Sequence, residues 1–178
     1  IILGSLPLVI VGYIFYSTNL IDQFRNLKVV AWTTLIFGIL LYFSDKFELK
    51  NKISSELNIK SIIIIGLFQI LAIIPGVSRS GIVITASRFL KFDRVESSKI
   101  AFYLSIPALA GASVLGFKDV IDDQINFDAI FIFSTSASFL FSYFTIKYFL
   151  IYVKMFSLSF FVIYRIVLSI ILFSIIYL

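Results

Sequence analysis

Long apolar runs recur from one end of this 178-residue chain to the other, and they constrain its fold more than any other feature. A helix needs about 20 predominantly apolar residues to cross a bilayer. Runs near this length occupy residues 1–17, 29–44, 99–117, 125–150 and 156–178. Because they recur, a cleavable signal peptide cannot account for them. The sequence therefore predicts one integral membrane domain over residues 1–178, all-α and polytopic, with about five transmembrane helices.

The composition argues in the same direction and excludes several kinds of site. Only 14% of the residues are charged, whereas soluble domains carry about 25%. The chain has no cysteine, so it has no disulfides, and no histidine, so it lacks the commonest general base and transition-metal ligand. Its net charge of +5 comes from residues scattered among loops, which is typical of membrane-helix flanks. We expect contacts with membrane lipids, no nucleic acid, and no metal ligands in this chain.

Residues 61–91 do not fit the pattern of complete spans. The apolar stretch before the sequence "PGVSRSG" has 14 residues, and the one after it is no longer, so each half is too short to cross. Pro75 cannot continue a helix through its own amide, and Gly76 and Gly81 loosen the backbone around it. We predict a re-entrant hairpin over about 61–91, with a loop at membrane depth. One long helix kinked at Pro75 is the alternative.

The loop of this hairpin has the composition of an anion site. A half-helix that starts near Ser78 would direct free backbone N–H groups and its positive dipole end into the loop, with Ser78 or Ser80 as the cap. Arg79 adds a planar fork of donors that matches phosphate or carboxylate oxygens. The alternative is that Arg79 pairs with a carboxylate, which must come from a distant segment because none lies between Lys60 and Asp93.

The stretch from Gly66 to Ser113 resembles the undecaprenyl pyrophosphate phosphatase (bacitracin resistance) family of bacteria. That family has a Pro-Gly-x-Ser-Arg-Ser-Gly loop preceded by a Phe-Gln pair. The matching residues here are Phe68, Gln69, Pro75, Gly76, Ser78, Arg79, Ser80 and Gly81. The segments "SKIAFYLSIPALAGA" and "FVIYRIVL" are similar to later helices of the family. The loop motif is highly specific, and the resemblance extends over residues 1–178.

The family's other signature, a Glu-rich re-entrant loop with Ser-Ser-Thr-Gly and a histidine, does not occur in this sequence. The chain begins at Ile1 inside an apolar run. We therefore expect an N-terminally truncated chain, the C-terminal two-thirds of the family fold, which alone would be inactive.

The resemblance implies an inverted-repeat architecture and an undecaprenyl-diphosphatase of the bacterial inner membrane. Such an enzyme hydrolyses undecaprenyl pyrophosphate to undecaprenyl phosphate and inorganic phosphate. This recycles the lipid carrier for peptidoglycan synthesis, and so supports cell wall biogenesis, cell shape and bacitracin resistance. The resemblance also implies a divalent cation, Mg²⁺ or Ca²⁺, with ligands expected in the missing N-terminal segment, and it is compatible with a homodimer.

The resemblance implies Arg79 and Ser78 as catalytic residues. It implies phosphate-binding residues at Gly76, Ser78, Arg79, Ser80 and Gly81. From their positions, Gln69 and Thr85 are candidates to line the cavity, although a helix–helix hydrogen bond for Gln69 and simple packing for Thr85 are the alternatives.

A broken helix with an intramembrane arginine also suits a secondary transporter or channel for an anionic solute, which is the alternative function. Lysine and arginine counts give an orientation. They place residues 45–60, residues 91–99 and Lys154 together in the cytoplasm, with residues 118–128 and Leu178 outside.

Overall fold

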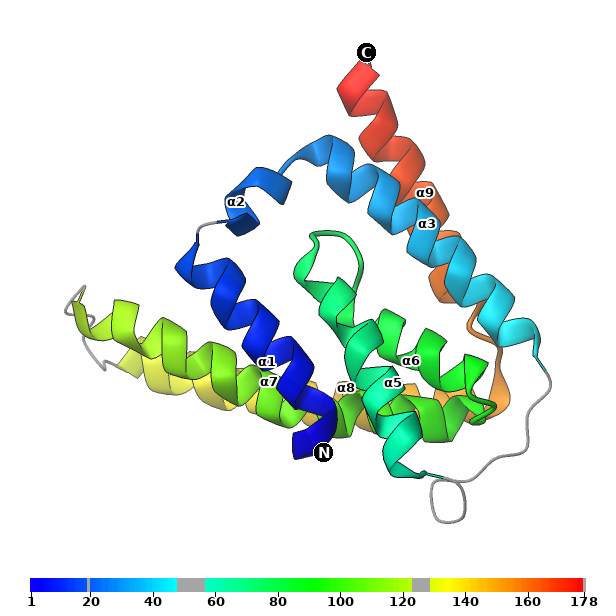
Figure 1. The fold of residues 1–178 in the computed structure, drawn as a ribbon, viewed down its shortest axis with the longest axis horizontal. Helices are drawn as coiled ribbons and strands as arrows, with labels where there is room; N and C mark the ends of the chain where they lie inside the picture. Colours follow the sequence, from blue (N-terminus) through cyan, green and yellow to red (C-terminus); the bar gives the residue numbers. More distant parts are fainter. Residues whose placement is uncertain (19, 48–56, 123–128, 178) are drawn as a thin grey trace.

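The computed structural model describes residues 1–18, 20–47, 57–122 and 129–177, and all regular secondary structure in these ranges is helical (Figure 1). The helices are α1 (Ile2–Ser17), α2 (Leu20–Phe24), α3 (Leu27–Lys46), α5 (Ile59–Ile70), the 3-10 turn η1 (Leu71–Ile73), α6 (Arg79–Phe89), α7 (Arg94–Asp122), α8 (Ala129–Met155) and α9 (Ser159–Tyr177). The predicted all-α class is confirmed.

Three of the described helices, α3, α8 and α9, are long and apolar enough to cross a membrane. They correspond to the predicted spans 29–44, 125–150 and 156–178. The predicted span 99–117 lies inside the 29-residue helix α7, and the span 1–17 corresponds to the 16-residue apolar helix α1. The structure is that of a polytopic helical membrane protein.

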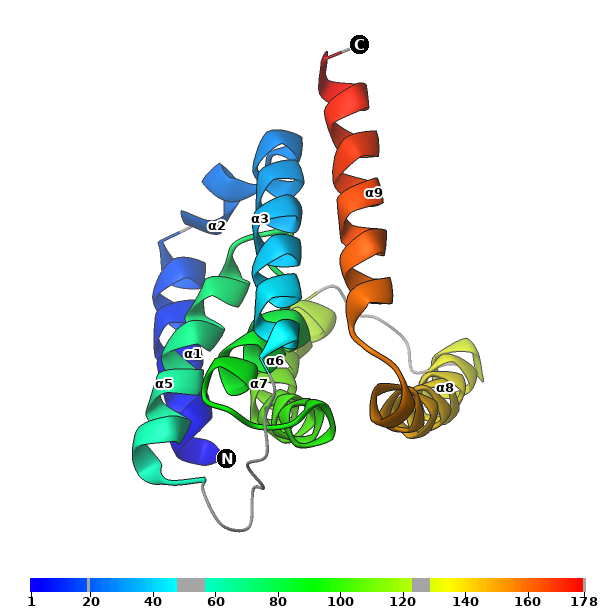
Figure 2. The ribbon, with the colours of Figure 1, turned by 90° about the vertical axis from the view of Figure 1, so that its right-hand side faces the viewer.

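Figures 1 and 2 show how these helices surround the segment between α5 and α7. Helices α1, α3, α5 and α9 stand roughly upright, and α7 and α8 cross beneath them, so that Figure 2 shows α7 and α8 nearly end on. Helix α3 packs against α9, and α1 packs against α5. Helix α6 contacts α3, α5 and α7, and most of its side chains are buried. The short helix α6 is therefore the centre of the described bundle.

Helices α5 and α6 form the predicted hairpin (Figure 1). They pack against each other, and the chain reverses between them through η1 and residues 74–78. Gly76 has φ of 88° and Ser78 has φ of 67°, a left-handed backbone that no continuous helix can contain. Pro75 immediately precedes this reversal. The alternative of one long helix kinked at Pro75 is wrong.

Asp45 ties together the end of the bundle opposite the hairpin tip. The residue is 8% exposed. Its carboxylate accepts two hydrogen bonds from Arg94, Nε at 2.7 Å and Nη2 at 3.0 Å, and one from the backbone N–H of Leu158 at 3.0 Å. Arg88 donates to the carbonyl oxygens of Asp45 and Phe47 at 2.8 and 2.9 Å. One carboxylate therefore joins the ends of α3 and α6, the start of α7 and the α8–α9 turn.

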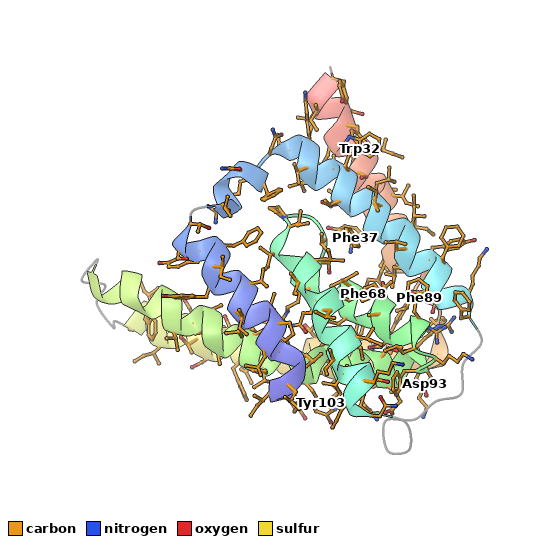
Figure 3. The ribbon with its side chains drawn as sticks, viewed as in Figure 1. Trp32, Phe37, Phe68, Phe89, Asp93 and Tyr103 are labelled. Atoms are coloured by element: carbon orange, nitrogen blue, oxygen red, sulfur yellow. The ribbon has the colours of Figure 1, made fainter. Side chains whose placement is uncertain are left out.

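The contacts of Asp45 confirm that the described start of the segment 45–60 and the segment 91–99 lie at the same end of the bundle. Asp93, labelled at that end in Figure 3, accepts a hydrogen bond from the N–H of Glu96 at 2.8 Å and so begins α7. Residues 48–56, within the predicted loop 45–60, and residues 123–128, within the predicted connection 118–128, lie outside the described residues. The assignment of the two ends of the bundle to the cytoplasm and the exterior stays a prediction.

Replacing Asp45 by alanine should destabilise the protein by about 3–5 kcal/mol, because it leaves the buried Arg88 without its nearby carboxylate and removes the hydrogen bonds to Arg94 and to the Leu158 N–H. Glu96→Gln is the matched control. It removes the pair with Lys99, whose side chain is 40% exposed, and should change stability by less than about 1 kcal/mol. Thermal unfolding in detergent measures both. Equal midpoints for the two variants would contradict the role given to Asp45.

Candidate functional site

The hairpin loop is held by its carbonyl groups on the side of α3. Thr33 on α3 donates from its hydroxyl to the carbonyl oxygen of Pro75 at 2.6 Å. The next residue, Thr34, donates to the carbonyl oxygen of Gly76 at 3.3 Å. Backbone groups at membrane depth need such partners because lipid offers none. Two adjacent threonines on a neighbouring helix therefore satisfy the carbonyl groups that the break in the helix leaves unpaired.

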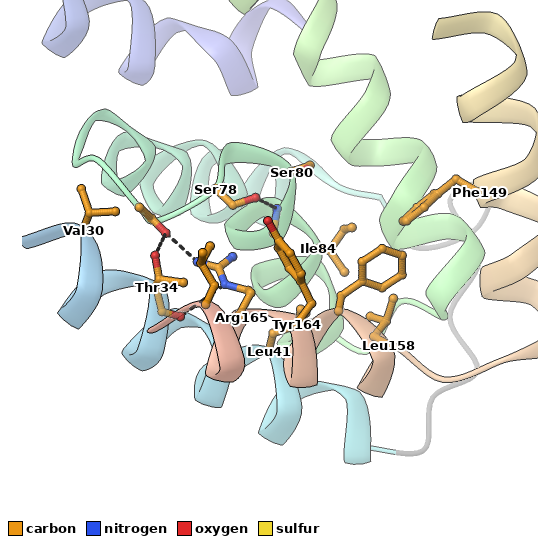
Figure 4. A pocket seen from close by; sticks show the side chains of 14 residues that line it. Val30, Thr34, Leu41, Ser78, Ser80, Ile84, Phe149, Leu158, Tyr164 and Arg165 are labelled. Atoms are coloured by element: carbon orange, nitrogen blue, oxygen red, sulfur yellow. Dashed lines mark hydrogen bonds between the residues drawn. The ribbon is translucent and has the colours of Figure 1, made fainter. Parts of the chain in front are cut away.

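Arg165 on α9 completes this arrangement. Its Nη2 donates to the carbonyl oxygen of Gly76 at 2.6 Å (Figure 4) and to that of Val77 at 3.0 Å, and its Nε donates to that of Thr34 at 3.3 Å. The residue is 7% exposed. Sequence reasoning did not place Arg165 in the site, although an arginine inside the last apolar run is the signal that could have indicated it.

With the loop carbonyls bound to α3 and α9, helix α6 begins as predicted, and Ser78 is its cap. The Ser78 hydroxyl oxygen accepts a hydrogen bond from the N–H of Gly81 at 3.3 Å. The N–H groups of Arg79 and Ser80, in the first turn, have no acceptor within the helix. The side chains of Ser78 and Ser80 are exposed. This end of α6 therefore offers backbone and hydroxyl donors at the positive end of a helix dipole.

A cavity of about 510 Å³ opens beside this helix start, between α3, α6, α8 and α9 (Figure 4). Its polar end is formed by Thr34, Gly76, Ser78, Ser80, Gly81 and Arg165. Its apolar wall is formed by Val30, Leu41, Ile84, Phe149, Leu158, Phe161 and Leu168, with Tyr164 beside them. Four of the five predicted phosphate-binding residues line this one cavity.

Arg79, the fifth of these residues, does not line the cavity. Its Nη1 donates to the carbonyl oxygen of Ser105 on α7 at 3.2 Å, and the side chain is half-buried. Within the described part of the chain it pairs with no carboxylate, so the alternative reading of Arg79 as half of an ion pair gains no support. A guanidinium has five N–H donors, and this contact leaves most of them available.

Gln69 and Thr85 also lie outside the lining of the cavity. Gln69 is fully buried, and neither atom of its amide group has a hydrogen-bond partner among the described residues. Thr85 is buried and donates to the carbonyl oxygen of Gly81 at 2.8 Å within α6. Packing thus accounts for Thr85, and nothing in the described contacts gives Gln69 a partner.

A divalent cation does not fit the described residues of this site. They contain no group of three or more Asp, Glu, His or Cys side chains that could hold a metal ion. The loop itself has no carboxylate, and the buried carboxylate of Asp45 belongs to the opposite end of the hairpin.

Comparison with known proteins matches residues 1–171 to the family described as "Bacitracin resistance protein BacA". A protein named undecaprenyl-diphosphatase from Pelagibacter ubique is 58% identical over 178 residues, covering 99% of this chain and 70% of that protein. One of the same name from Elusimicrobium minutum is 41% identical, covering 97% of this chain and 65% of the relative. One from Thermobifida fusca is 33% identical, covering 99% and 60%. The chain spans about two thirds of the length of these relatives.

Replacing Gly76 by alanine should destabilise the loop by at least about 1–3 kcal/mol, the usual cost of a non-glycine residue in a strained backbone region. A Cβ at Gly76 would also collide with the Thr33 hydroxyl and approach the Val30 carbonyl oxygen to 2.8 Å. Gly12→Ala on α1 is the control, because no atom beyond its chain neighbours and its own helix backbone lies within 4 Å of the added Cβ. Thermal unfolding should show a lowered midpoint for the first variant and an unchanged or raised one for the second. A normal midpoint for Gly76→Ala would show that the loop adopts another conformation.

Proposed function

This chain belongs to the Bacitracin resistance protein BacA family, and on that premise we propose that it provides the phosphate-binding half of an undecaprenyl-diphosphatase active site. In this reaction undecaprenyl diphosphate and water give undecaprenyl phosphate and inorganic phosphate, with cleavage of the bond between the terminal phosphorus and the bridging oxygen. The name undecaprenyl-diphosphatase, printed for the relatives, indicates hydrolysis of this diphosphate, and the geometry of the hairpin loop suits it.

One observation carries the proposal: helix α6 begins inside an apolar bundle, with Ser78 as its cap and Arg79 as its first residue. Helix N-termini bind phosphate through free N–H groups and the helix dipole. Donors held in advance stabilise the charge that develops on phosphate oxygens during the reaction. The N–H groups of Arg79 and Ser80 and the hydroxyls of Ser78 and Ser80 are donors of this kind.

The fixed carbonyls of the loop support the same role. Carbonyl oxygens repel phosphate, and in a loop of irregular backbone some would face the substrate. Here those of Pro75, Gly76 and Val77 are bound by threonine hydroxyls and by Arg165. The loop therefore presents its donors to a bound anion and keeps these acceptors against α3 and α9.

The Ser78 hydroxyl has capacity for a second contact. Its oxygen accepts from Gly81, and its own proton remains free to donate to a phosphate oxygen. Arg79 donates a hydrogen bond to the carbonyl oxygen of Ser105 on α7 at 3.2 Å. We propose that it exchanges this hydrogen bond for one to a phosphate oxygen when substrate binds. An arginine fork gains more from a bidentate contact with phosphate than from a single carbonyl.

Phosphoryl transfer also needs a group that activates the nucleophile and often a divalent cation. The described residues near the loop provide neither, so we derive no step through a metal. We propose that these functions, including any Mg²⁺ or Ca²⁺ ligands, come from other residues of the complete enzyme. We propose that the enzyme lies in the bacterial inner membrane, because its proposed substrate is a membrane lipid, and that it recycles the carrier there for cell-wall synthesis. Association as a homodimer stays a proposal.

In the complete enzyme, Arg79→Ala should lower phosphate release from undecaprenyl diphosphate by about 10²–10³-fold, the usual effect of removing one donor to developing charge. Arg79→Lys should also be strongly impaired, because an ammonium group cannot form the bidentate fork. Membrane insertion and the unfolding midpoint should stay near normal, since Arg79 makes one hydrogen bond to the described residues. Near-normal turnover by Arg79→Lys would show that charge alone matters. Anion flux into liposomes without phosphate release would favour the transporter alternative.

Ser78→Ala removes both a helix cap and a hydroxyl donor to phosphate. Asn58→Ala removes a helix cap alone and is therefore the matched control. Asn58 caps α5 by accepting from the N–H of Ser61 at 2.8 Å, at the opposite end of the hairpin. Each substitution should cost about 1 kcal/mol of stability through the lost cap. Only Ser78→Ala should lower phosphate release, by at least about tenfold. Equal activity in the two variants would remove Ser78 from the site.

A further inference from the structure

A second cavity, of about 1080 Å³, lies at the base of the hairpin, at the end of the bundle where Figure 3 labels Asp93. It is bounded by the ends of α3 and α6, the start of α7 and the α8–α9 turn. Both charges occur in its lining. The cationic side chains are Lys46, Arg88, Arg94 and Lys154.

The three carboxylates of the lining already have partners within the protein. Asp45 binds Arg94, with 2.7 Å between its Oδ1 and Nε. Glu96 binds Lys99 at 2.9 Å. Asp93 accepts a hydrogen bond from the N–H of Glu96 at 2.8 Å. Each carboxylate of the cavity is thus engaged at a helix end.

The basic side chains of the lining are paired less completely. Lys154, in the last turn of α8, is exposed and forms no ion pair with a described carboxylate. Lys46 also forms none, and its Nζ lies 4.4 Å from the centre of the Tyr42 ring. Arg88 is 4% exposed, and its Nε has no acceptor among the described residues. The two lysines therefore lack a counter-charge in the described part of the chain.

The start of α9, a short turn after Lys154, adds donors to this cavity. The N–H groups of Ser159 and Phe160 have no acceptor within the helix, and the positive end of the helix dipole lies there. The Ser157 hydroxyl donates to the Ser159 oxygen at 3.0 Å, so the Ser159 proton is free to donate to another acceptor. The first turn of α9 has no acidic residue, whereas that of α7 contains Glu96. An anion in the cavity is therefore favoured at the start of α9.

The position of the cavity indicates a lipid head group as the source of this anion. Helix α3 ends at Lys46, α8 ends at Met155 and α9 begins at Ser159, so the cavity lies where three helices long enough to cross a membrane end. Head-group phosphates lie at this level of a bilayer, and basic pockets between membrane helices bind anionic head groups. Tyr42 and Phe47 add apolar surface to the lining, which suits the glycerol and acyl parts of a lipid.

We propose that the cavity at the base of the hairpin binds an anionic membrane phospholipid, with its phosphate beside Lys154 and the start of α9. The inference does not depend on the proposed function, because the phosphate site of that proposal lies at the hairpin tip. A lipid bound here contacts the ends of α3 and α8 and the starts of α7 and α9 together. Because it binds the folded protein, it raises thermal stability.

Thermal unfolding of the complete enzyme in uncharged detergent micelles tests the inference. Phosphatidylglycerol should raise the unfolding midpoint as its mole fraction rises. Phosphatidylcholine, whose head group carries a fixed cation, should not. Lys154→Ala should require about fivefold more phosphatidylglycerol for the same rise, the effect of about 1 kcal/mol for one basic residue at an anionic lipid. Lys147→Ala is the matched control and should respond as wild type does, because Lys147 is an exposed lysine of α8 outside the lining.

Ser159→Asp places a fixed carboxylate at the first residue of α9, where we propose the lipid phosphate. A carboxylate at a helix start interacts favourably with the dipole, so the midpoint without lipid should stay the same or rise. Its repulsion of phosphate should abolish the rise with phosphatidylglycerol. An undiminished rise in Ser159→Asp, equal responses of Lys154→Ala and Lys147→Ala, or an equal effect of phosphatidylcholine on wild type would each overturn the inference.

Two further measurements separate the base from the tip and a lipid from a soluble anion. Ser78→Ala should keep the wild-type response to phosphatidylglycerol, because Ser78 lies at the hairpin tip. Loss of the response in this variant would place the lipid at the tip. Inorganic phosphate should leave the wild-type midpoint unchanged, and a rise that Lys154→Ala abolishes would assign the cavity to a soluble anion. Either of these results would overturn the inference.

Discussion

The fork of hydrogen bonds from Arg165 to the carbonyls of Gly76 and Val77 is the interaction on which the site depends. A helix broken at membrane depth leaves carbonyl groups that lipid cannot satisfy. Arg165 and two threonines of α3 satisfy them and so fix which way the loop faces. Donors are left on one side of the loop and acceptors on the other. An anion site made of backbone groups needs this separation before any residue of the loop can contact phosphate.

The two ends of the hairpin are held by opposite means. At the tip, a cation on α9 binds backbone dipoles and has no carboxylate partner among the described residues. At the base, the carboxylate of Asp45 binds Arg94 bidentately and also contacts Arg88 and the α8–α9 turn. The arginine charge at the base is compensated by a carboxylate, whereas the charge at the tip is compensated by backbone dipoles among the described residues. The tip therefore keeps a net positive charge that suits the proposed anionic substrate, and the base provides the fixed support.

Much of this could be predicted from the sequence because local physics decides it. Run lengths of apolar residues predict the helices, and the shortness of the two halves around Pro75 predicts the hairpin. A serine cap could be predicted because serine favours the position before a helix, but the sequence left Ser78 and Ser80 as alternatives, and only the structure shows that Ser78 is the cap. The orientation of Arg79 could not be predicted in this way. Its position in the motif suggested the cavity, yet its side chain donates to the Ser105 carbonyl oxygen on α7, an acceptor that only the packing of α7 against α6 brings within reach.

The sequence by itself determined that the chain is a helical membrane protein with a broken helix, and it predicted an anion site in the loop, since hydropathy, proline and the Ser-Arg-Ser-Gly motif act over short distances. Only the tertiary structure decided which distant groups complete the loop. Arg165 lies 89 residues after Gly76 in the chain and Thr33 lies 42 residues before Pro75. Neither spacing leaves a pattern in the sequence, because helix packing alone brings α3 and α9 against the loop.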